Sequence, residues 1–319
     1  MAEFPPNSWL GYSLNMATAK PPVNSSAAIG SIQKDRRILN FDPDNARPID
    51  IDGQTYSVPR DIAVSQNIAG GETFTTFSSG EEATTKFESD PSLMPRLLSL
   101  AGGTSVIRSI TTNFFRSDRQ YAFYSLRQPR YSATLSNFDD LFNSAALLPA
   151  VRELPPFSGQ NQSAVAQYRT FFQTFGSHVV TSMEFGSAYR TTVWAARTRP
   201  DVNDAWTENV KADCDGIPSG GQFDEKIKQT SQYGRYLDLR ERDQQVSGGD
   251  LELAVALARD PKYQTFQEWK RTGGQKSTPI YFSLVDIWTL MKNSDNIELV
   301  RAAIDCLAAY EWIVDHPSN

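Results

Sequence analysis

The sequence predicts one domain of mixed α and β structure. Stretches in which apolar residues recur at helical spacing are interspersed with stretches in which apolar and polar residues alternate, as in strands. No repeat of fixed period and no obvious linker divides the 319 residues. A chain of this length can bury a large core, so one α+β domain spanning residues 1–319 is favoured over two smaller ones.

The first 60 residues are rich in Pro, Asn and Asp, which predicts turns joining short strands. We expect strands at Arg37–Phe41 and Gln54–Val58. The segment FDPDNARPIDIDG at 41–53 contains scattered acidic residues but lacks the ligand spacing of an EF-hand loop. We therefore expect a solvated turn there.

Residues 71–125 are polar and show no clear preference for helix or strand. A short helical pattern runs from Leu93 to Leu100 and is interrupted by Gly102 and Gly103. Three apolar residues then recur at helical spacing, although the Ser, Thr and Asn residues between them also suit a strand: Val106, Ile110 and Phe114. The local preference is ambiguous.

The middle of the chain is better defined. A strand is expected at Tyr131–Leu135, followed by a helix at Phe138–Leu148 with Asn137 as its cap. A second helix is expected at Ser163–Phe175, because its apolar residues form one stripe. It leads directly into Val179–Ala196, which is long enough to form an unusually extended strand.

Residues 199–247 are again polar and irregular, apart from Asn209–Asp215. In that stretch apolar and polar residues alternate, with Val210, Ala212 and Cys214 on one side. An apolar helix is expected at 251–258.

The C-terminal part is conventional. A strand is expected at Thr278–Ile287 and an amphipathic helix at Ile297–Val314, within a C-terminal helical segment at 289–319. Ser294 or Asp295 is the expected cap. The expected core face of this helix consists of Ile297, Val300, Ile304, Leu307 and Tyr310.

Composition narrows the classes of function. The net charge of −6 argues against nucleic acid as the main partner and against simple attraction to anionic lipid. Two cysteines, Cys214 and Cys306, are too few for a disulfide framework and are expected to be free thiols. There is no apolar stretch of 18 residues, and the N-terminus lacks the features of a signal peptide, so the default expectation is a soluble protein.

The segment FGSHVVTSMEFG at 175–186 poses the main functional question, because a Ser–His pair invites a catalytic interpretation. The chain has only two histidines, no G-x-S-x-G elbow, no phosphate-binding glycine loop and no zinc-ligand spacing. We therefore expect no catalytic residue, no metal and no cofactor. Gly176 suits a tight turn, His178 can pin a bend through its two ring nitrogens, and Gly186 marks a kink in a long strand.

This pattern resembles the signature of the membrane-attack-complex/perforin (MACPF) family, within the MACPF/cholesterol-dependent cytolysin superfamily. The family signature is an aromatic residue, Gly, Thr or Ser, His and an aromatic or aliphatic residue, with Gly-Gly further on. Here it reads FGSHV at 175–179 and then FGS at 185–187. The chain departs from the signature in Phe175, in Val179 and in Ser187, which replaces the second glycine and is expected to stiffen the bend.

Three further stretches resemble the family in the right order. WLGYSLN at 9–15 resembles the opening segment, and AQYRTFFQTFGSH at 166–178 resembles the helix before the signature. VSGGD at 246–250, followed by a helix, Trp269 and TPIYFSLVDIWTLM at 278–291, resembles the closing stretch. The resemblance covers nearly the whole chain.

The resemblance implies a bent and twisted central antiparallel sheet flanked by two helical clusters, which fall here at 72–128 and 199–247. In the family these clusters unfurl into amphipathic β-hairpins, and oligomerised subunits build a β-barrel pore. The implied hinge residues are Phe175, Gly176, Ser177, His178, Phe185, Gly186, Gly248 and Gly249. The candidate membrane-inserting residues are Val106, Ile110, Phe114, Val210, Ala212 and Cys214.

The implied function is that of a cytolysin, a toxin-like protein released as a soluble monomer that forms a ring or arc on a target membrane. Its expected partners are a membrane lipid or receptor, further copies of itself and a separately encoded membrane-binding protein. Arg108 and Arg116 share strand parity with the apolar residues of 106–114, and such charges are costly on a lipid face. Two alternatives therefore stay open: a non-lytic binding or developmental module of the same fold, and an enzyme of unknown class, secreted or cytoplasmic, that uses His178.

Overall fold

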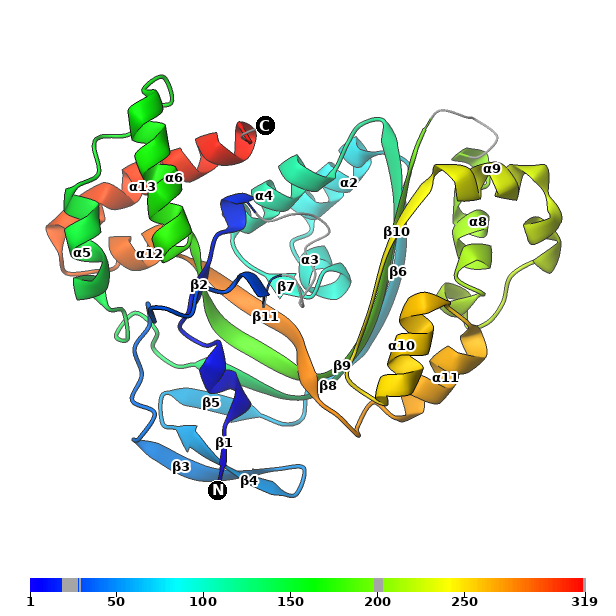
Figure 1. The fold of residues 1–319 in the computed structure, drawn as a ribbon, viewed down its shortest axis with the longest axis horizontal. Coiled ribbons are helices and arrows are strands. Elements are labelled where there is room, and N and C mark those ends of the chain that lie inside the picture. The colour runs from blue at the N-terminus through cyan, green and yellow to red at the C-terminus, as the bar shows by residue number, and fades with distance from the viewer. Residues whose placement is uncertain (19–27, 29, 198–202, 318–319) are drawn as a thin grey trace.

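A computed structural model describes residues 1–18, 28, 30–197 and 203–317. Its central sheet is built on two long antiparallel strands, β8 (Arg119–Leu135) and β9 (His178–Ala196). Both strands curve strongly near their middle, so the sheet is bent (Figure 1). This confirms the expected α+β fold with a bent central sheet.

The partners of β8 and β9 change at the bend. On one side of it, β6 (Gly71–Phe77) pairs with β8 and β10 (Arg240–Ser247) pairs with β9. On the other side, β5 (Ile62–Ser65) pairs with β8, while β11 (Thr278–Asp286) and β2 (Ser13–Leu14) pair with β9. The short β7 (Leu100–Ala101) pairs with β11 in parallel, an exception in an otherwise antiparallel sheet.

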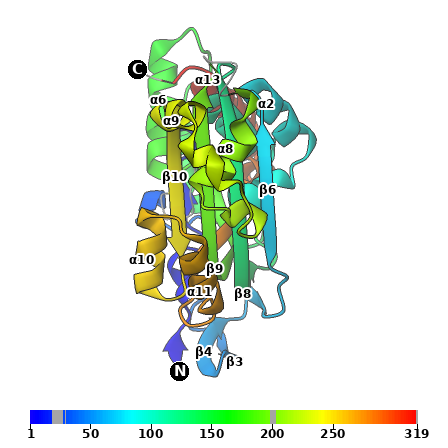
Figure 2. The ribbon, with the colours of Figure 1, turned by 90° about the vertical axis from the view of Figure 1, so that its right-hand side faces the viewer.

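Two groups of helices cover opposite faces of the β6–β8–β9–β10 half of the sheet (Figures 1 and 2). The first cluster lies between β6 and β8 in sequence and comprises α2 (Gly80–Ser89), α3 (Leu93–Leu97) and α4 (Thr104–Phe114). The second cluster lies between β9 and β10 and comprises α8 (Trp206–Asp213), η3 (Ile217–Ser219), η4 (Glu225–Gln229) and α9 (Ser231–Leu239).

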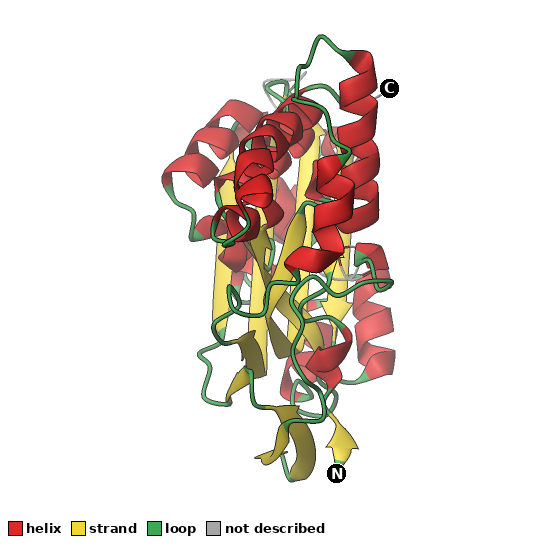
Figure 3. Ribbon diagram, turned by 90° about the vertical axis from the view of Figure 1, so that its left-hand side faces the viewer, coloured by secondary structure: helices red, strands yellow, loops and turns green. Residues whose placement is uncertain are grey.

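The remaining helices pack at the two ends of the sheet. At one end lie α5 (Ser144–Arg152), α6 (Gln162–Phe175), α12 (Ile287–Lys292) and α13 (Ile297–Asp315), which Figure 3 shows in front of the sheet. Beneath the second cluster lie α10 (Leu251–Arg259) and α11 (Tyr263–Arg271). A separate three-stranded sheet of β1 (Ala2–Glu3), β4 (Gln54–Pro59) and β3 (Ala46–Ile51) forms near the N-terminus, with 3-10 turns η1 (Pro5–Ser8) and η2 (Met16–Thr18) after β1 and β2.

Several predicted elements agree with the structure to within a few residues. The helix at Ser163–Phe175 is α6, and the long strand at Val179–Ala196 is β9. The predicted strands at Gln54–Val58 and Thr278–Ile287 are β4 and β11, and the helix at 251–258 is α10. The ambiguous stretch around Val106 is helical, within α4.

Two early predictions are wrong. Arg37–Phe41 is not a strand, because its pairing is limited to one bridge between Leu39 and Phe142. Residues 46–51 within the expected turn form β3, which pairs with β4 across a tight turn at Asp52 and Gly53. Asp52 and Gly53 both have positive φ, and such a turn closes a two-stranded hairpin.

The predicted helix at Phe138–Leu148 begins later, at Ser144. Asn137 has a φ of 50° and starts a turn instead of capping a helix, with the amide of Asp140 donating to its carbonyl.

Asn209–Asp215, which alternates like a strand, lies largely in the helix α8. The polar segment 71–77 forms β6, and β8 begins twelve residues before the predicted Tyr131.

The C-terminal helix has a different cap from the predicted one and, apart from Tyr310, a different buried face. Asn296 accepts hydrogen bonds from the amides of Glu298 and Leu299, so neither Ser294 nor Asp295 is the cap. Ile297 and Ile304 are 59% and 75% exposed. The helix is apolar on more than one side, and the face that packs on the core is Leu299, Ala303, Cys306, Ala309, Tyr310, Ile313 and Val314.

The position of this cap yields a test. Asn296→Ala removes the acceptor for two amides at the start of α13, so we expect the free energy of unfolding to fall by about 1 kcal/mol. Asp295→Ala, which changes an exposed neighbour, should have an effect of less than about 0.5 kcal/mol. Urea denaturation of both variants measures the difference, and equal losses would contradict the assignment.

Candidate functional site

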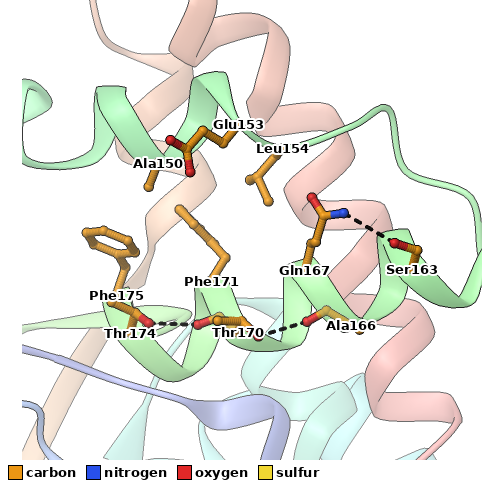
Figure 4. Close-up of a pocket in the computed structure, with 10 residues that line it drawn as sticks. All are labelled: Ala150, Glu153, Leu154, Ser163, Ala166, Gln167, Thr170, Phe171, Thr174 and Phe175. Carbon is orange, nitrogen blue, oxygen red and sulfur yellow. Dashed lines mark hydrogen bonds between the residues drawn. The ribbon is translucent and has the colours of Figure 1, made fainter.

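A groove between α5 and α6 has a volume of about 420 Å³ and is lined partly by Phe171 and Phe175 (Figure 4). Its polar side chains on α6 bond within that helix: Gln167 to Ser163, and Thr170 to the carbonyl of Ala166. No polar groups converge on a common point in the groove. The groove therefore lacks the arrangement that binding of a polar ligand or catalysis requires.

The signature segment makes a tight junction between α6 and β9. Phe175 is the last residue of α6, and Gly176 follows with a φ of 73°. A Cβ atom at Gly176 would lie 2.6 Å from the Cβ of Ser13. Both the left-handed conformation and this close approach require glycine.

His178 is fully buried at the start of β9 and bonds through both ring nitrogens. Its Nδ1 lies 2.8 Å from Oγ of Ser177, and its Nε2 lies 2.9 Å from Oδ1 of Asp286. Nε2 is also 3.1 Å from Oγ of Ser105, which itself donates to Asp286. Nδ1 can accept from the Ser177 hydroxyl while Nε2–H donates to the carboxylate.

These are the residue types of a hydrolase triad, but their geometry does not support nucleophilic catalysis. Ser177 is fully buried, and its hydroxyl accepts the amide of Met16 at 2.8 Å. Ser105 and Asp286 both contact Nε2 of His178, whereas a catalytic histidine contacts its nucleophile through one ring nitrogen and its carboxylate through the other. The geometry favours the structural interpretation of His178.

The His178 network instead joins three distant parts of the chain. His178 belongs to β9, Ser105 to α4 in the first cluster, and Asp286 to the end of β11. From α13, the hydroxyl of Tyr310 donates to the carbonyl of Ser105 at 3.1 Å. The network therefore fixes the first helical cluster to the sheet and to the C-terminal helix.

Asp286 lies beside the N-terminus of α4, which has no side-chain cap of its own. A carboxylate in this position interacts favourably with the helix dipole. Burial raises the pKa of Asp286, but hydrogen bonds from His178, Ser105 and Thr289 oppose this effect, and the net pKa lies below its usual value. The folded protein therefore favours the ionised carboxylate.

The second group of predicted hinge residues lies at the bend itself. A Cβ atom on Gly186 would come within 2.2 Å of the carbonyl oxygen of Gln128 on β8. Gly248, with a φ of 71°, would place a Cβ atom 2.4 Å from the carbonyl oxygen of Gly186. Trp269 donates to the carbonyl of Gly248 at 3.0 Å, and the adjacent Gly249 leaves room for its indole. Close packing of backbone requires glycine at these positions.

Phe185 and Ser187 both make side-chain contacts with β8 at the bend. Phe185 stacks on Tyr131 of β8, with ring centroids 5.0 Å apart. Ser187 donates to the side-chain oxygen of Gln128 at 3.1 Å, and Gln128 donates to the carbonyl of Lys270 on α11. These hydrogen bonds tie both long strands to α11 at the bend.

The structure does not bring the two groups of hinge residues together. His178 and Gly186 are eight positions apart in one strand, or about 26 Å at a rise of about 3.3 Å per residue. His178 anchors one end of β9, whereas Gly186 lies at the bend. Whether these residues act as a hinge stays a prediction.

Sequence reasoning missed an ionic cluster beside the bend. Nη1 of Arg127 lies 3.3 Å from Oε2 of Glu184, and the buried Arg190 donates to the carbonyl of Ile280. Burial raises the pKa of Glu184 against the opposing effect of the two arginines. Burial and the charge of Arg127 lower the pKa of Arg190 to about 9. The sequence feature that could have revealed this cluster is the presence of charged residues inside two long strands, Arg127 in β8 and Glu184 and Arg190 in β9.

All six candidate membrane-inserting residues are buried in this state. Val106, Ile110 and Phe114 lie on one face of α4 and pack into the main core. Arg108 points away from that core and pairs with Asp315 and Glu311 of α13. In the second cluster, a small core beneath α8 and α9 contains the other three candidates, Val210, Ala212 and Cys214.

Two further findings concern the described part of the chain. None of its helices combines the length and the hydropathy needed to cross a bilayer. Within the same residues, no group of three or more His, Cys, Asp or Glu side chains is arranged to hold a metal ion. Cys214 and Cys306 are both free and buried, and burial raises the pKa of each thiol to about 12.

Comparison with known proteins places this geometry in context. The family model of the MAC/Perforin domain matches residues 10–311. The chain is similar in structure to GNIP1Aa from Chromobacterium piscinae, with 14% identity, a TM-score of 0.53 and coverage of 94% of this chain and 55% of that one. It is also similar to a protein with a MAC/Perforin domain from Bacteroides thetaiotaomicron, with 10% identity, a TM-score of 0.52 and coverage of 94% and 59%.

This chain therefore spans little more than half the length of those two proteins. At such low identities the structural likeness shows a shared fold and no more. The chain has no match among curated proteins.

Asp286 provides a test of the network around His178. Asp286→Asn should lower the free energy of unfolding by about 2–4 kcal/mol at pH 7, because it removes the charge that His178 and Ser105 bond. Since the folded pKa is depressed, this contribution is complete above about pH 4 and is lost as pH falls through the folded pKa. Denaturation from pH 7 to pH 3 should show the two proteins converging.

The exposed Asp140→Asn is the matched control for that experiment and should unfold like the parent at every pH. A constant gap between Asp286→Asn and the parent down to pH 3 would show that the charge of Asp286 is not what stabilises the network.

The close approach at the bend gives a second test. Gly186→Ala places a methyl group against the backbone of β8, so we expect a loss of about 2–4 kcal/mol in the free energy of unfolding. Gly71→Ala, in the neighbouring β6 with open space around it, should change stability by less than about 1 kcal/mol. Similar denaturation midpoints for the two variants would rule out the packing argument.

Proposed function

The chain belongs to the MAC/Perforin domain family, and we propose that it is a pore-forming protein that assembles from several copies on a target membrane. In this proposal both helical clusters unfold into amphipathic β-hairpins, which together line a β-barrel. The supporting observation is topological: each cluster is an insertion between two strands that belong to the same sheet. Extending those strands would convert helix into hairpin without rerouting the chain.

The lengths of the two insertions support this proposal. Residues 78–118 connect β6 to β8, and residues 197–239 connect β9 to β10. Each insertion has about 40 residues, so each arm of an extended hairpin would reach about 65 Å at about 3.3 Å per residue. A bilayer core is about 30 Å thick, so both hairpins would be long enough to cross it.

The edges of the sheet support assembly between copies. β6, β8, β9 and β10 lie side by side, and each is antiparallel to its neighbour. The outer strands β6 and β10 therefore run in opposite directions, and β6 of a second copy placed beside β10 would continue the antiparallel order. A closed ring of such copies leaves no unpaired strand edge in the lipid.

One observation favours the non-lytic alternative. In an extended strand Arg108 and Arg116 would share a face with the three apolar residues of α4. A charge at the midplane of a lipid face costs about 2–4 kcal/mol, but about 0–1 kcal/mol near the interface. A pore therefore requires this part of the hairpin to lie near the membrane surface; otherwise the chain acts as a binding module. The separate membrane-binding partner likewise stays a prediction.

A reversible tether tests pore formation. The hydroxyl oxygens of Thr76 on β6 and Thr207 on α8 are 3.4 Å apart, so cysteines there can form a disulfide. On vesicles from which the untethered parent releases calcein, with a membrane-binding partner protein added where release requires one, we expect oxidised T76C/T207C protein to release no calcein and reduction to restore release. The native thiols are buried and do not interfere.

The control disulfide T134C/S182C lies between β8 and β9, where the two hydroxyl oxygens are 2.7 Å apart, and touches neither cluster. It should leave calcein release unchanged. Full release by the oxidised T76C/T207C protein would contradict insertion of the second cluster. No release by the untethered parent under any condition, including on target-cell membranes that carry a binding partner, with normal folding, would favour the non-lytic module.

A further inference from the structure

The two helical clusters are held to the sheet by very different amounts of buried structure. In the first cluster, α4 packs into the main hydrophobic core of the molecule. Seven of its eleven residues are buried: Ser105, Val106, Ile107, Ser109, Ile110, Thr111 and Phe114. The helix also packs against elements outside the sheet, since Ser109 bonds the carbonyl of Met16 and Tyr310 bonds that of Ser105.

The helices α8 and α9 of the second cluster pack on the sheet alone, whereas η3 also packs against α10 and α11 through the buried Ile217. Figure 2 shows α8 and α9 as the outermost layer over the sheet. α9 buries only Tyr233 and Tyr236, and the 3-10 turn η4 buries none of its residues. Among the described residues, the core beneath this cluster consists of Ala122, Val193, Ala195, Trp206, Val210, Ala212, Cys214, Tyr233 and Tyr236.

The carboxylate of Asp213 joins three segments, namely α8, α9 and the adjoining strand β10. Asp213, at the end of α8, is only 6% exposed. Its two oxygens accept a bidentate pair of hydrogen bonds from Arg240 of β10, at 2.7 and 3.2 Å. Tyr236 of α9 donates to Asp213 at 3.0 Å, and Arg242 of β10 lies 3.5 Å away. Bidentate bonds to a buried carboxylate are among the strong polar interactions in proteins.

These bonds fix the boundary between helix and strand. Leu239 is the last residue of α9 and Arg240 is the first residue of β10, with no loop between them. While Arg240 is bonded to Asp213, α9 is held against the end of α8. Without that bond, the residues before Arg240 are free to continue β10 in the direction that it already follows.

We propose that Asp213 is the lock of the second cluster and that this cluster detaches from the sheet before the first one does. Detachment is a property of the soluble monomer. Its place in the order of membrane insertion rests on the proposed pore-forming function. The proposal follows from the one-sided packing of α8 and α9 and from the concentration of polar bonds on a single carboxylate.

Hydrogen–deuterium exchange with mass spectrometry on the intact soluble chain tests the proposal. In the parent, amides of 206–239 should exchange at least about tenfold faster than those of 104–114, because local opening exposes less buried surface. Asp213→Asn should accelerate exchange in 206–239 by about tenfold more and leave 104–114 unchanged. A partial acceleration is expected for Arg240→Lys, which keeps the charge but loses the bidentate bond.

Asp238→Asn is the matched control, since it makes the same charge change at an exposed position of α9. It should leave exchange in both segments as in the parent. Equal or faster exchange of 104–114 in the parent would overturn the order of detachment. Asp213→Asn behaving like Asp238→Asn would overturn the lock. If Asp213→Asn does not fold, Arg240→Lys with unchanged exchange would do the same.

Failure of this proposal is distinguishable from failure of pore formation. The exchange measurement needs no membrane, so a fast-opening second cluster in a protein that releases no calcein supports the lock and contradicts the pore. Calcein release together with slow exchange in 206–239 would contradict the lock alone.

Discussion

The continuous antiparallel pairing of β8 with β9 is the constraint on which the rest of the structure depends. Two strands of 17 and 19 residues present backbone groups on both outer sides, and each buried group needs a partner. Different strands supply these partners on the two sides of the bend, so β8 and β9 change their outer neighbours where the sheet curves. Only glycine allows the chains to cross closely enough there, which is why Gly186 and Gly248 occupy the crossing.

The clusters on the two faces combine weak local preference with firm tertiary attachment. Their Ser, Thr and charged residues suit neither helix nor strand strongly, so packing against the sheet decides their conformation. Attachment of the first cluster is shared among the core, α13 and the His178 network. Attachment of the second rests on a small core, on the bonds of Asp213, on the contact of Ile217 with α10 and α11, and on a few hydrogen bonds to the sheet such as that of Trp206 to the carbonyl of Tyr121. Under the proposed function, in which each cluster changes its fold, attachments of this kind would let a few contacts control the change.

Sequence patterns predicted the strongly periodic elements, α6, β9, α10 and β11, because their buried faces are continuous. They failed for β6, whose threonine-rich sequence lacks an apolar alternation, and for the first half of β8. They also assigned the wrong face to α13, since a helix with apolar residues on several sides does not reveal which one is covered. Part of the site could be predicted from the sequence, namely a histidine flanked by glycine near the start of a long strand. Its partner Ser105 could not be predicted, because it lies 73 residues away in the sequence and only the fold brings the two side chains together.

The opposed directions of β6 and β10 have a consequence for the proposed assembly. Each copy contributes an even number of strands, so the alternation of up and down is preserved across every junction, whatever the number of copies. Strand direction then imposes no preferred stoichiometry. Curvature between neighbours alone would decide when a growing arc closes, and complete and incomplete circles would share the same local geometry.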